Sequence, residues 1–246
     1  MASAVDAPAG DGGDGNGNGN GDGKPAKSLE WAQRVGHQRS SLFFYRLVRF
    51  LIRLLLFRWL RTRVRGAERL SIEGPVIIAP VHRSNLDAPL IASAGTRRMR
   101  ALGKRSLFVN PVSAWVCAAL GAIPLRRGEA DRDAMRAART ILDDGEMMLV
   151  FPEGTRQSGP TVAGVFDGMS YLANKTGATI VPVGIAGTEA ALPSGARFFR
   201  RVPTAIVVGE PIPAPEGRMS RPALAEFSAM VGERLQAAFD EAKGLI

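Results

Sequence analysis

The sequence has one cysteine and no long uncharged apolar run, and these two absences exclude several classes of protein. A single Cys117 excludes an intramolecular disulfide, which is typical of a protein in a reducing compartment. It lies in the apolar stretch 114–120, so we expect a buried, unreactive thiol. No uncharged run approaches the roughly 20 residues that cross a bilayer, so no transmembrane helix is expected.

The first thirty residues lack the apolar side chains that a folded core needs. Residues 11–23 contain only Gly, Asp and Asn, which cannot offset the entropy cost of ordering the chain. No apolar segment follows a basic start, so a secretory signal is not expected. We therefore predict a disordered tail over 1–30, basic amphipathic helices over 31–65 and a globular domain over 66–246.

Basic residues outnumber acidic ones, and the excess lies beyond the tail. The net charge is +9, whereas the first thirty residues hold five acids and two lysines, a net −3, so the remainder carries +12. Such a balance indicates an anionic partner: a nucleic acid, a membrane surface or a phosphorylated substrate. No helix-turn-helix, zinc or aromatic-stacking module accompanies the arginines, so no nucleic acid partner is expected.

The segment 42–60 alternates arginines with aliphatic and aromatic residues at helical spacing. Three arginines form one stripe of the helix, and the opposite side is apolar. This pattern favours a helix lying in the interface of an anionic membrane, with the arginines at headgroups. The alternative is a helix whose apolar side packs on the protein's own core. The residues expected at the membrane are Arg46, Arg49, Arg53, Phe50, Leu54 and Phe57.

Beyond this segment, apolar strand-like runs alternate with helical ones. This alternation predicts a single α/β domain with a largely parallel or mixed sheet flanked by helices. The expected strands are 76–79, 99–103, 122–125, 147–151, 180–185 and 205–209. The expected helices are 86–94, 111–120, 131–142, 165–175 and 221–242, the last capped by Ser220.

One of only two histidines, His82, stands five residues before Asp87, where a strand gives way to a helix. On a continuous helix the two would lie about 140° apart, so they meet only if the chain turns between them. A carboxylate on one ring nitrogen of a neutral histidine makes the other nitrogen a general base. The structural alternative is that Asp87, alone or with Ser84 in a capping box, only caps the helix.

Three more motifs follow in order: 121–128 with Pro124-Leu-Arg-Arg-Gly, 151–156 with Phe-Pro-Glu-Gly-Thr-Arg, and 180–185 with Val-Pro-Val. With His82-x4-Asp87, the chain resembles the glycerolipid acyltransferases typified by lysophosphatidic acid acyltransferase, over about residues 65–215. The resemblance implies an acyltransferase domain that moves an acyl group from acyl-CoA or acyl carrier protein to 1-acylglycerol 3-phosphate, giving phosphatidic acid. His82 is then the general base and Asp87 its partner.

The resemblance also implies an acceptor-phosphate site, which maps onto Arg127, Glu153 and Arg156. Guanidinium groups bind phosphate with paired hydrogen bonds. Since a carboxylate would repel phosphate, we expect Glu153 to orient Arg156 or a glycerol hydroxyl. Lys104 adds a further cation, and backbone amides around Gly154-Thr155 are candidates for holding the reaction's oxyanion.

Other features bear on the mechanism and on the acceptor. Without a Gly-x-Ser-x-Gly motif or an activated cysteine, a covalent acyl-enzyme is not expected, and Ser84 is the second-ranked nucleophile. Arg126 stands where the family often has an acid, which leaves acceptor identity open. The apolar residues Val162, Phe166, Met169 and Tyr171 are expected in the core.

The expected partners are therefore acyl-CoA or acyl carrier protein, a lysophospholipid and an anionic membrane surface, with no metal and no cofactor beyond the acyl donor. We expect a peripheral protein on the cytoplasmic face of the cell membrane. Two alternatives stay open. The same chemistry could use glycerol 3-phosphate, another lysophospholipid or a glycolipid as acceptor, or the protein could be a non-catalytic membrane-binding protein.

Overall fold

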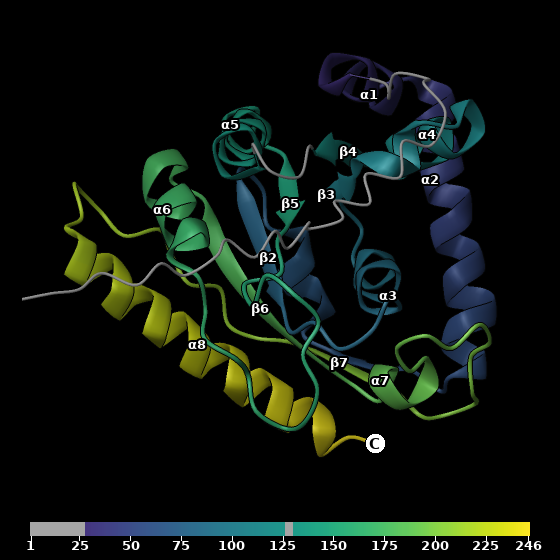
Figure 1. Ribbon diagram of the computed structural model, residues 1–246. Coiled ribbons are helices and arrows are strands. Elements are labelled where there is room, and N and C mark those ends of the chain that lie inside the picture. The colour runs from purple at the N-terminus through teal and green to yellow at the C-terminus, as the bar shows by residue number, and fades with distance from the viewer. Residues whose placement is uncertain (1–27, 126–129) are drawn as a thin grey trace, which may run out of the picture.

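A seven-stranded mixed sheet runs through the centre of the computed structural model, which describes residues 28–125 and 130–246 (Figure 1). The strand order is β1-β7-β6-β2-β5-β3-β4, and only the β6–β7 pair is antiparallel. The strands are β1 (Arg63–Arg65), β2 (Val76–Pro80), β3 (Met99–Lys104), β4 (Ala122–Leu125), β5 (Met147–Leu149), β6 (Thr179–Ala186) and β7 (Ala205–Val208). The predicted α/β class and the six predicted strands are confirmed, and only β1 was missed.

The sheet is covered on both faces, which explains its apolar strands. All five residues of β2 are buried, as expected for a central strand of a parallel sheet. Because side chains alternate across a strand, Val76 and Ile78 enter one core while Ile77 and Ala79 enter the other. Helix α3 packs on the first core, and helices α5 and α6 pack on the second.

The α-helices follow the predicted order, with α1 and α2 in the region of the predicted amphipathic helices and the short α7 added. They are α1 (Leu29–Gly36), α2 (Arg39–Leu51), α3 (Asp87–Ala94), α4 (Pro111–Ala119), α5 (Ala130–Asp143), α6 (Asp167–Thr176), α7 (Thr188–Ala191) and α8 (Arg221–Lys243). A π-helical stretch, η1 (Ile52–Phe57), continues α2, and two short 3₁₀ turns, η2 (Ala67–Ser71) and η3 (Arg105–Phe108), complete the elements. No helix within 28–125 and 130–246 is long and apolar enough to span a membrane.

Helix α8 lies close against the sheet because β6 has a glycine where the two meet. A Cβ on Gly184 would lie 2.1 Å from the carbonyl oxygen of Ala238, so only glycine allows this approach. Ser220 caps α8 as predicted, its hydroxyl accepting a hydrogen bond from the amide of Ala223 at 3.3 Å.

Two of the three arginines of α2–η1 donate hydrogen bonds to the protein itself, which corrects the prediction that all three are held at headgroups. Arg53 donates to the carbonyls of Ser93, Ala94 and Gly95 at the end of α3, with 2.7 Å to Ala94 and 3.1 Å to Gly95. Arg49 donates to the carbonyl of Thr96 just beyond. A helix end leaves its last carbonyls without intrahelical donors, and a guanidinium satisfies several at once. Of the three, only Arg46 is exposed without a contact of this kind among the described residues.

The apolar side of α2–η1 faces outward instead, so the alternative of packing on the protein's own core is wrong for most of it. Phe50 is 59 % exposed and Leu54 46 %, whereas Phe57 packs against the core and does not belong to the outer surface. The outward stripe consists of Leu42, Phe43, Leu47, Phe50, Leu51, Leu54, Leu55 and Trp59.

Other arginines likewise bind carbonyls inside the protein. Arg98 donates to the carbonyls of Gly36, Ala118 and Ala119, at the ends of α1 and α4, and burial lowers its pKa to about 10. Arg97 binds the carbonyls of the loops that flank β2 and β5. At least four arginines therefore donate hydrogen bonds that hold the fold together.

Candidate active site

The candidate site lies where β2 and β5 end. These strands are parallel neighbours, so the loops that follow them leave the sheet at the same edge, where α/β folds bind ligands. The His82–Asp87 turn follows β2, and the Phe151–Arg156 motif follows β5. The two loops contact each other directly, since the amide of Gln157 donates to the carbonyl of His82 at 2.9 Å.

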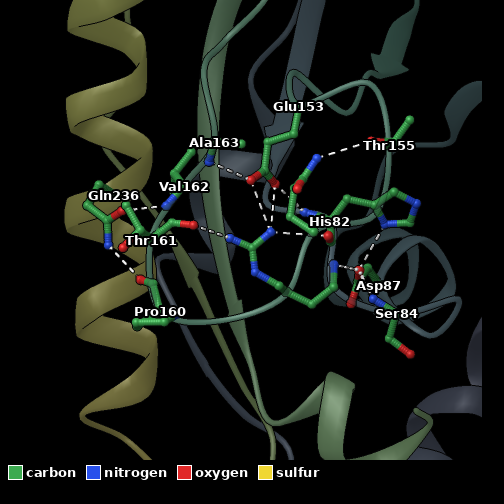
Figure 2. A network of polar contacts seen from close by, with 12 residues as sticks. His82, Ser84, Asp87, Glu153, Thr155, Pro160, Thr161, Val162, Ala163 and Gln236 are labelled. Atoms are coloured by element: carbon green, nitrogen blue, oxygen red, sulfur yellow. Dashed lines mark hydrogen bonds and ion pairs between the residues drawn. The ribbon is translucent and has the colours of Figure 1, made fainter. Parts of the chain in front are cut away.

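The predicted His–Asp pair is formed. His82 Nδ1 lies 3.0 Å from Asp87 Oδ2, and Asp87 is fully buried at the first residue of α3 (Figure 2). The same oxygen accepts the amides of Arg83 at 2.6 Å and Ser84 at 2.7 Å, so the turn wraps around the carboxylate. The capping alternative is therefore not exclusive: Asp87 holds both the turn and the histidine.

The arrangement leaves one nitrogen of His82 available. An ionised carboxylate only accepts hydrogen bonds, so its contact assigns the ring proton to Nδ1 and the lone pair to Nε2. Among the described residues Nε2 has no hydrogen-bond partner, and the side chain is 19 % exposed. Phe151 stacks on the ring at 3.8 Å between centroids, which fixes its plane. A fixed, accessible, neutral imidazole nitrogen is what general base catalysis requires.

Glu153 has a different role from the one expected, because it does not orient Arg156. Its buried carboxylate lies 2.9 Å and 3.0 Å from Nη1 of Arg83. It also accepts the amide of His82 at 2.9 Å and that of Ala163 at 2.9 Å. With four short contacts inside the protein, this carboxylate joins the histidine turn to the loop after β5.

Arg83 is the site residue whose role the sequence left open. It is 5 % exposed, donates to the carbonyl of Thr161 at 3.0 Å and lies over the ring of Phe239 of α8 at 4.9 Å. The available signal was Glu153 itself, since a glutamate in a phosphate-binding motif needs a cation. Gln236 of α8 supports the same loop by accepting the amide of Val162 at 2.7 Å (Figure 2).

Two of the remaining phosphate-site candidates, Arg156 and Lys104, lie within the described residues, and both are exposed. Arg156 is exposed, with no hydrogen-bond or ion-pair partner in the part of the chain that the structure describes. Lys104 is exposed at the carboxyl end of β3. Arg127 and Arg126 lie outside the described residues, so their predicted positions stay predictions.

The amides proposed for the oxyanion are already used within the loop. The Gly154 amide donates to the carbonyl of Phe151 at 3.1 Å, and the Thr155 amide donates to the backbone carbonyl of Glu153 at 2.8 Å. Gly154 has φ of 70°, and a Cβ there would lie 2.8 Å from the ring of Phe166. The turn therefore requires glycine for conformation and for space.

Three expectations about apolar and nucleophilic residues are decided by burial. Phe166 is 65 % exposed and Tyr171 43 %, so these two are not core residues, whereas Met169 is buried. Ser84 is buried with its hydroxyl donating to the carbonyl of Leu192 at 2.9 Å, which does not favour a nucleophile. Cys117 is half-buried, and burial raises its thiol pKa, so it is not an activated thiol.

An apolar cavity of about 330 Å³ borders α3, the helix that begins at Asp87. It runs between α2–η1 and α3, from Ala88 next to Asp87 to Ser93, and is closed below by strand residues such as Leu149. No single sequence motif marks this cavity, because its walls come from elements far apart in the chain. Its walls are Tyr45, Val48, Arg49, Ile52, Ala88, Pro89, Ala92, Ser93, Met99, Ala101, Leu120, Ala122 and Leu149.

Comparison with known proteins agrees with this geometry. A family model described as acyltransferase matches residues 61–186, just over half of the chain. The chain belongs to this acyltransferase family. The matched region contains the His–Asp turn, the Phe151–Arg156 motif and the Val-Pro-Val strand, so the resemblance seen in the motifs is confirmed.

Relatives of this acyltransferase domain include one plant protein, one animal protein and one solved structure. It is 26 % identical over 156 residues to the chloroplastic 1-acyl-sn-glycerol-3-phosphate acyltransferase LPAT1 of Arabidopsis thaliana, covering 62 % of this chain and 44 % of that one. It is 26 % identical over 151 residues to the human 1-acyl-sn-glycerol-3-phosphate acyltransferase alpha, covering 60 % and 53 %. The chain thus spans about half the length of these relatives.

The crystal structure of the 1-acyl-sn-glycerophosphate acyltransferase PlsC from Thermotoga maritima has the same fold. The two match with a TM-score of 0.68 and 26 % identity, over 85 % of this chain and 86 % of that one. The fold similarity therefore extends well beyond the motifs.

The buried pair of Arg83 and Glu153 generates a prediction about stability. Glu153→Gln leaves the Arg83 guanidinium buried without its counter-charge, so the free energy of unfolding should fall by about 3–5 kcal/mol in urea titrations. Glu241→Gln is the matched control, because it breaks an exposed ion pair with Arg65 and should cost at most about 1 kcal/mol. A variant as stable as the wild type, but with a raised KM for the acceptor, would instead support the substrate role expected from sequence.

Proposed function

We propose that this acyltransferase moves an acyl group from acyl-CoA or acyl carrier protein to the hydroxyl of 1-acylglycerol 3-phosphate, giving phosphatidic acid. The observation that carries the proposal is the His82–Asp87 pair, with Nδ1 held by a buried carboxylate and Nε2 free. The family assignment and the activities for which the relatives are named support the same reaction.

In the proposed reaction, His82 Nε2 removes the proton of the acceptor hydroxyl as its oxygen attacks the thioester carbonyl. Asp87 stabilises the imidazolium that forms, and the tetrahedral intermediate collapses as the C–S bond breaks. The proton then passes from His82 to the leaving thiolate. Direct transfer of this kind needs no acyl-enzyme, which is consistent with the occupied hydroxyl of Ser84.

The substrates are proposed to bind on either side of the pair. Arg156, with Arg127 and Lys104, supplies cations for the acceptor phosphate, and the exposure of Arg156 supports this assignment. The 330 Å³ cavity beside α3 offers an apolar site for an acyl chain. The outward stripe of α2–η1 would dock the protein peripherally on the cytoplasmic face of the cell membrane, where both lipid substrates reside.

The acceptor is tested by incubating purified protein with labelled acyl-CoA or acyl carrier protein and a panel of acceptors, with products read by mass. The panel holds 1-acylglycerol 3-phosphate, glycerol 3-phosphate, other lysophospholipids and a glycolipid. If transfer occurs only to another compound of the panel, that compound is the acceptor in place of 1-acylglycerol 3-phosphate. Transfer to none of them would favour the non-catalytic alternative.

The catalytic pair leads to a direct prediction. His82→Ala should lower kcat by about 10²–10⁴-fold, because general base assistance is lost. The matched control is His37→Ala, which removes the other histidine, exposed at the end of α1. Circular dichroism must show both variants folded. Near-normal turnover by folded His82→Ala would refute the mechanism.

Arg156 allows the acceptor-phosphate site to be tested separately from chemistry. Arg156→Ala should raise the KM for 1-acylglycerol 3-phosphate by about 10–100-fold, since a charge-assisted hydrogen bond contributes roughly 1.5–3 kcal/mol. The KM for the acyl donor should change little. Arg218→Ala, an exposed arginine just before α8, is the control. An equal loss with a phosphate-free acceptor such as a monoacylglycerol would show that Arg156 does not bind phosphate.

The outward stripe predicts how membrane binding depends on α2–η1. Phe43→Ser, Phe50→Ser and Leu54→Ser together should weaken co-sedimentation with vesicles by at least about tenfold, because each side chain loses apolar burial in the membrane. Arg53→Gln should act mainly on thermal stability, because its guanidinium binds the end of α3. Unchanged sedimentation of the triple variant would exclude this stripe as the docking surface.

A further inference from the structure

The loop between α7 and β7 carries two exposed phenylalanines among arginines, a combination that the fold does not need. Phe198 is 84 % exposed and Phe199 52 %. The three surrounding arginines are also exposed and have no acidic partner in residues 28–125 and 130–246. They are Arg197, Arg200 and Arg201.

This loop is built rigidly, although its tip is exposed. A turn closes at its start, where the amide of Ala196 donates to the carbonyl of Pro193 at 3.0 Å around Gly195 with φ of 82°. The amide of Arg200 donates to the carbonyl of Ala191 at 2.7 Å. A rigid base presents the two rings without a large entropy cost on binding.

The loop is also joined to the end of the membrane-facing helix. The guanidinium of Arg201 lies over the Trp59 ring, 5.5 Å from its centroid. The amide of Thr204 donates to the carbonyl of Leu60 at 3.0 Å. Figure 1 shows the loop after α7 beside the lower end of the helix labelled α2. Since Trp59 belongs to the outward stripe, the loop extends that stripe with aromatic and cationic groups.

The base of the same loop is connected to the catalytic turn. Ser84, within the His82–Asp87 turn, donates from its hydroxyl to the carbonyl of Leu192 at 2.9 Å. A surface that holds this loop therefore also holds the edge of the site where an acceptor would enter.

We propose that the segment Arg197–Arg201 is a second membrane-binding element, in which Phe198 and Phe199 insert among acyl chains while the three arginines bind anionic phosphate headgroups. The occupant is an anionic lipid bilayer, because exposed aromatics next to unpaired cations match its apolar interior and charged surface. The inference rests on the proposed docking of α2–η1. With two contacts on one face, the protein has a single orientation on the membrane.

The test compares two variants of the full chain by co-sedimentation with two kinds of vesicle, one of phosphatidylcholine alone and one of equal parts phosphatidylcholine and phosphatidylglycerol. Phe198→Ser/Phe199→Ser should weaken binding to both kinds. Arg197→Gln/Arg200→Gln/Arg201→Gln should weaken binding to the anionic vesicles by about tenfold or more, with little change on the neutral ones. Added salt should reproduce the second effect.

Matched controls change the same residue types at the opposite end of the molecule. Tyr171→Ser removes an exposed aromatic ring of α6, and Arg218→Gln/Arg221→Gln removes two exposed arginines at the start of α8. These variants should bind both kinds of vesicle as the wild type does. Loss of binding equal to that of the loop variants would mean that no specific element is involved, and would overturn the proposal.

A depth measurement keeps the proposal testable even if a loop variant folds poorly. A fluorophore attached to Phe198→Cys, in a Cys117→Ala background, should be quenched by lipids brominated along the acyl chain when anionic vesicles are added. A label that stays unquenched while the protein binds through α2–η1 would overturn the proposal. Activity of the unchanged protein toward a soluble short-chain acceptor decides the proposed reaction independently, so failure of one proposal is distinguishable from failure of the other.

Discussion

The buried ion pair between Arg83 and Glu153 is the interaction on which the site depends. Each partner is almost fully buried, and the pair joins the turn after β2 to the loop after β5. Two charges without water are costly unless every lone pair and proton is used. Glu153 meets this condition by also accepting the amides of His82 and Ala163, whereas the Nε of Arg83 is buried without a hydrogen-bond partner among the described residues. The position of the His82 backbone thus follows from an ion pair that does not itself contact the His82 ring.

A second use of charge shapes the rest of the molecule, because arginines hold the carboxyl ends of helices. Arg53 and Arg49 bind the end of α3, while Arg98 binds the ends of α1 and α4. Since α3 begins at Asp87, the helix that faces the proposed membrane surface is connected through α3 to the carboxylate of Asp87. The cavity of about 330 Å³ lies between these two helices, with Arg49 in its wall.

This use of arginine explains why net charge was a poor guide to surfaces. Helical spacing predicted a cationic stripe at headgroups, yet two of its three arginines donate hydrogen bonds to carbonyls of the protein. Exposed cations near the outward stripe include Arg46 of α2, Arg58 just after η1 and the arginines of the segment Arg197–Arg201. Among the described residues, the arginine side chains of that segment make no hydrogen bond to a helix end like those of Arg53. A guanidinium and a helix end satisfy each other equally well whether or not a membrane is present, so sequence pattern alone does not separate the two roles.

The sequence by itself determined the α/β class, six of the seven strands, the cap of α8 and the pairing of His82 with Asp87, because these follow from local periodicity, turn residues and a spacing that requires a turn. It did not predict β1, whose three residues, Arg63–Arg65, carry no continuous apolar run and form a strand only by pairing with β7. Only the tertiary structure decided what Glu153 and Arg53 bind, which face of α2–η1 is exposed and where the cavity lies. The contacts of Arg53 and Glu153 join residues about 40 and 70 positions apart in the chain, and the cavity is formed by several elements at once. A local sequence pattern contains no information about such distant partners.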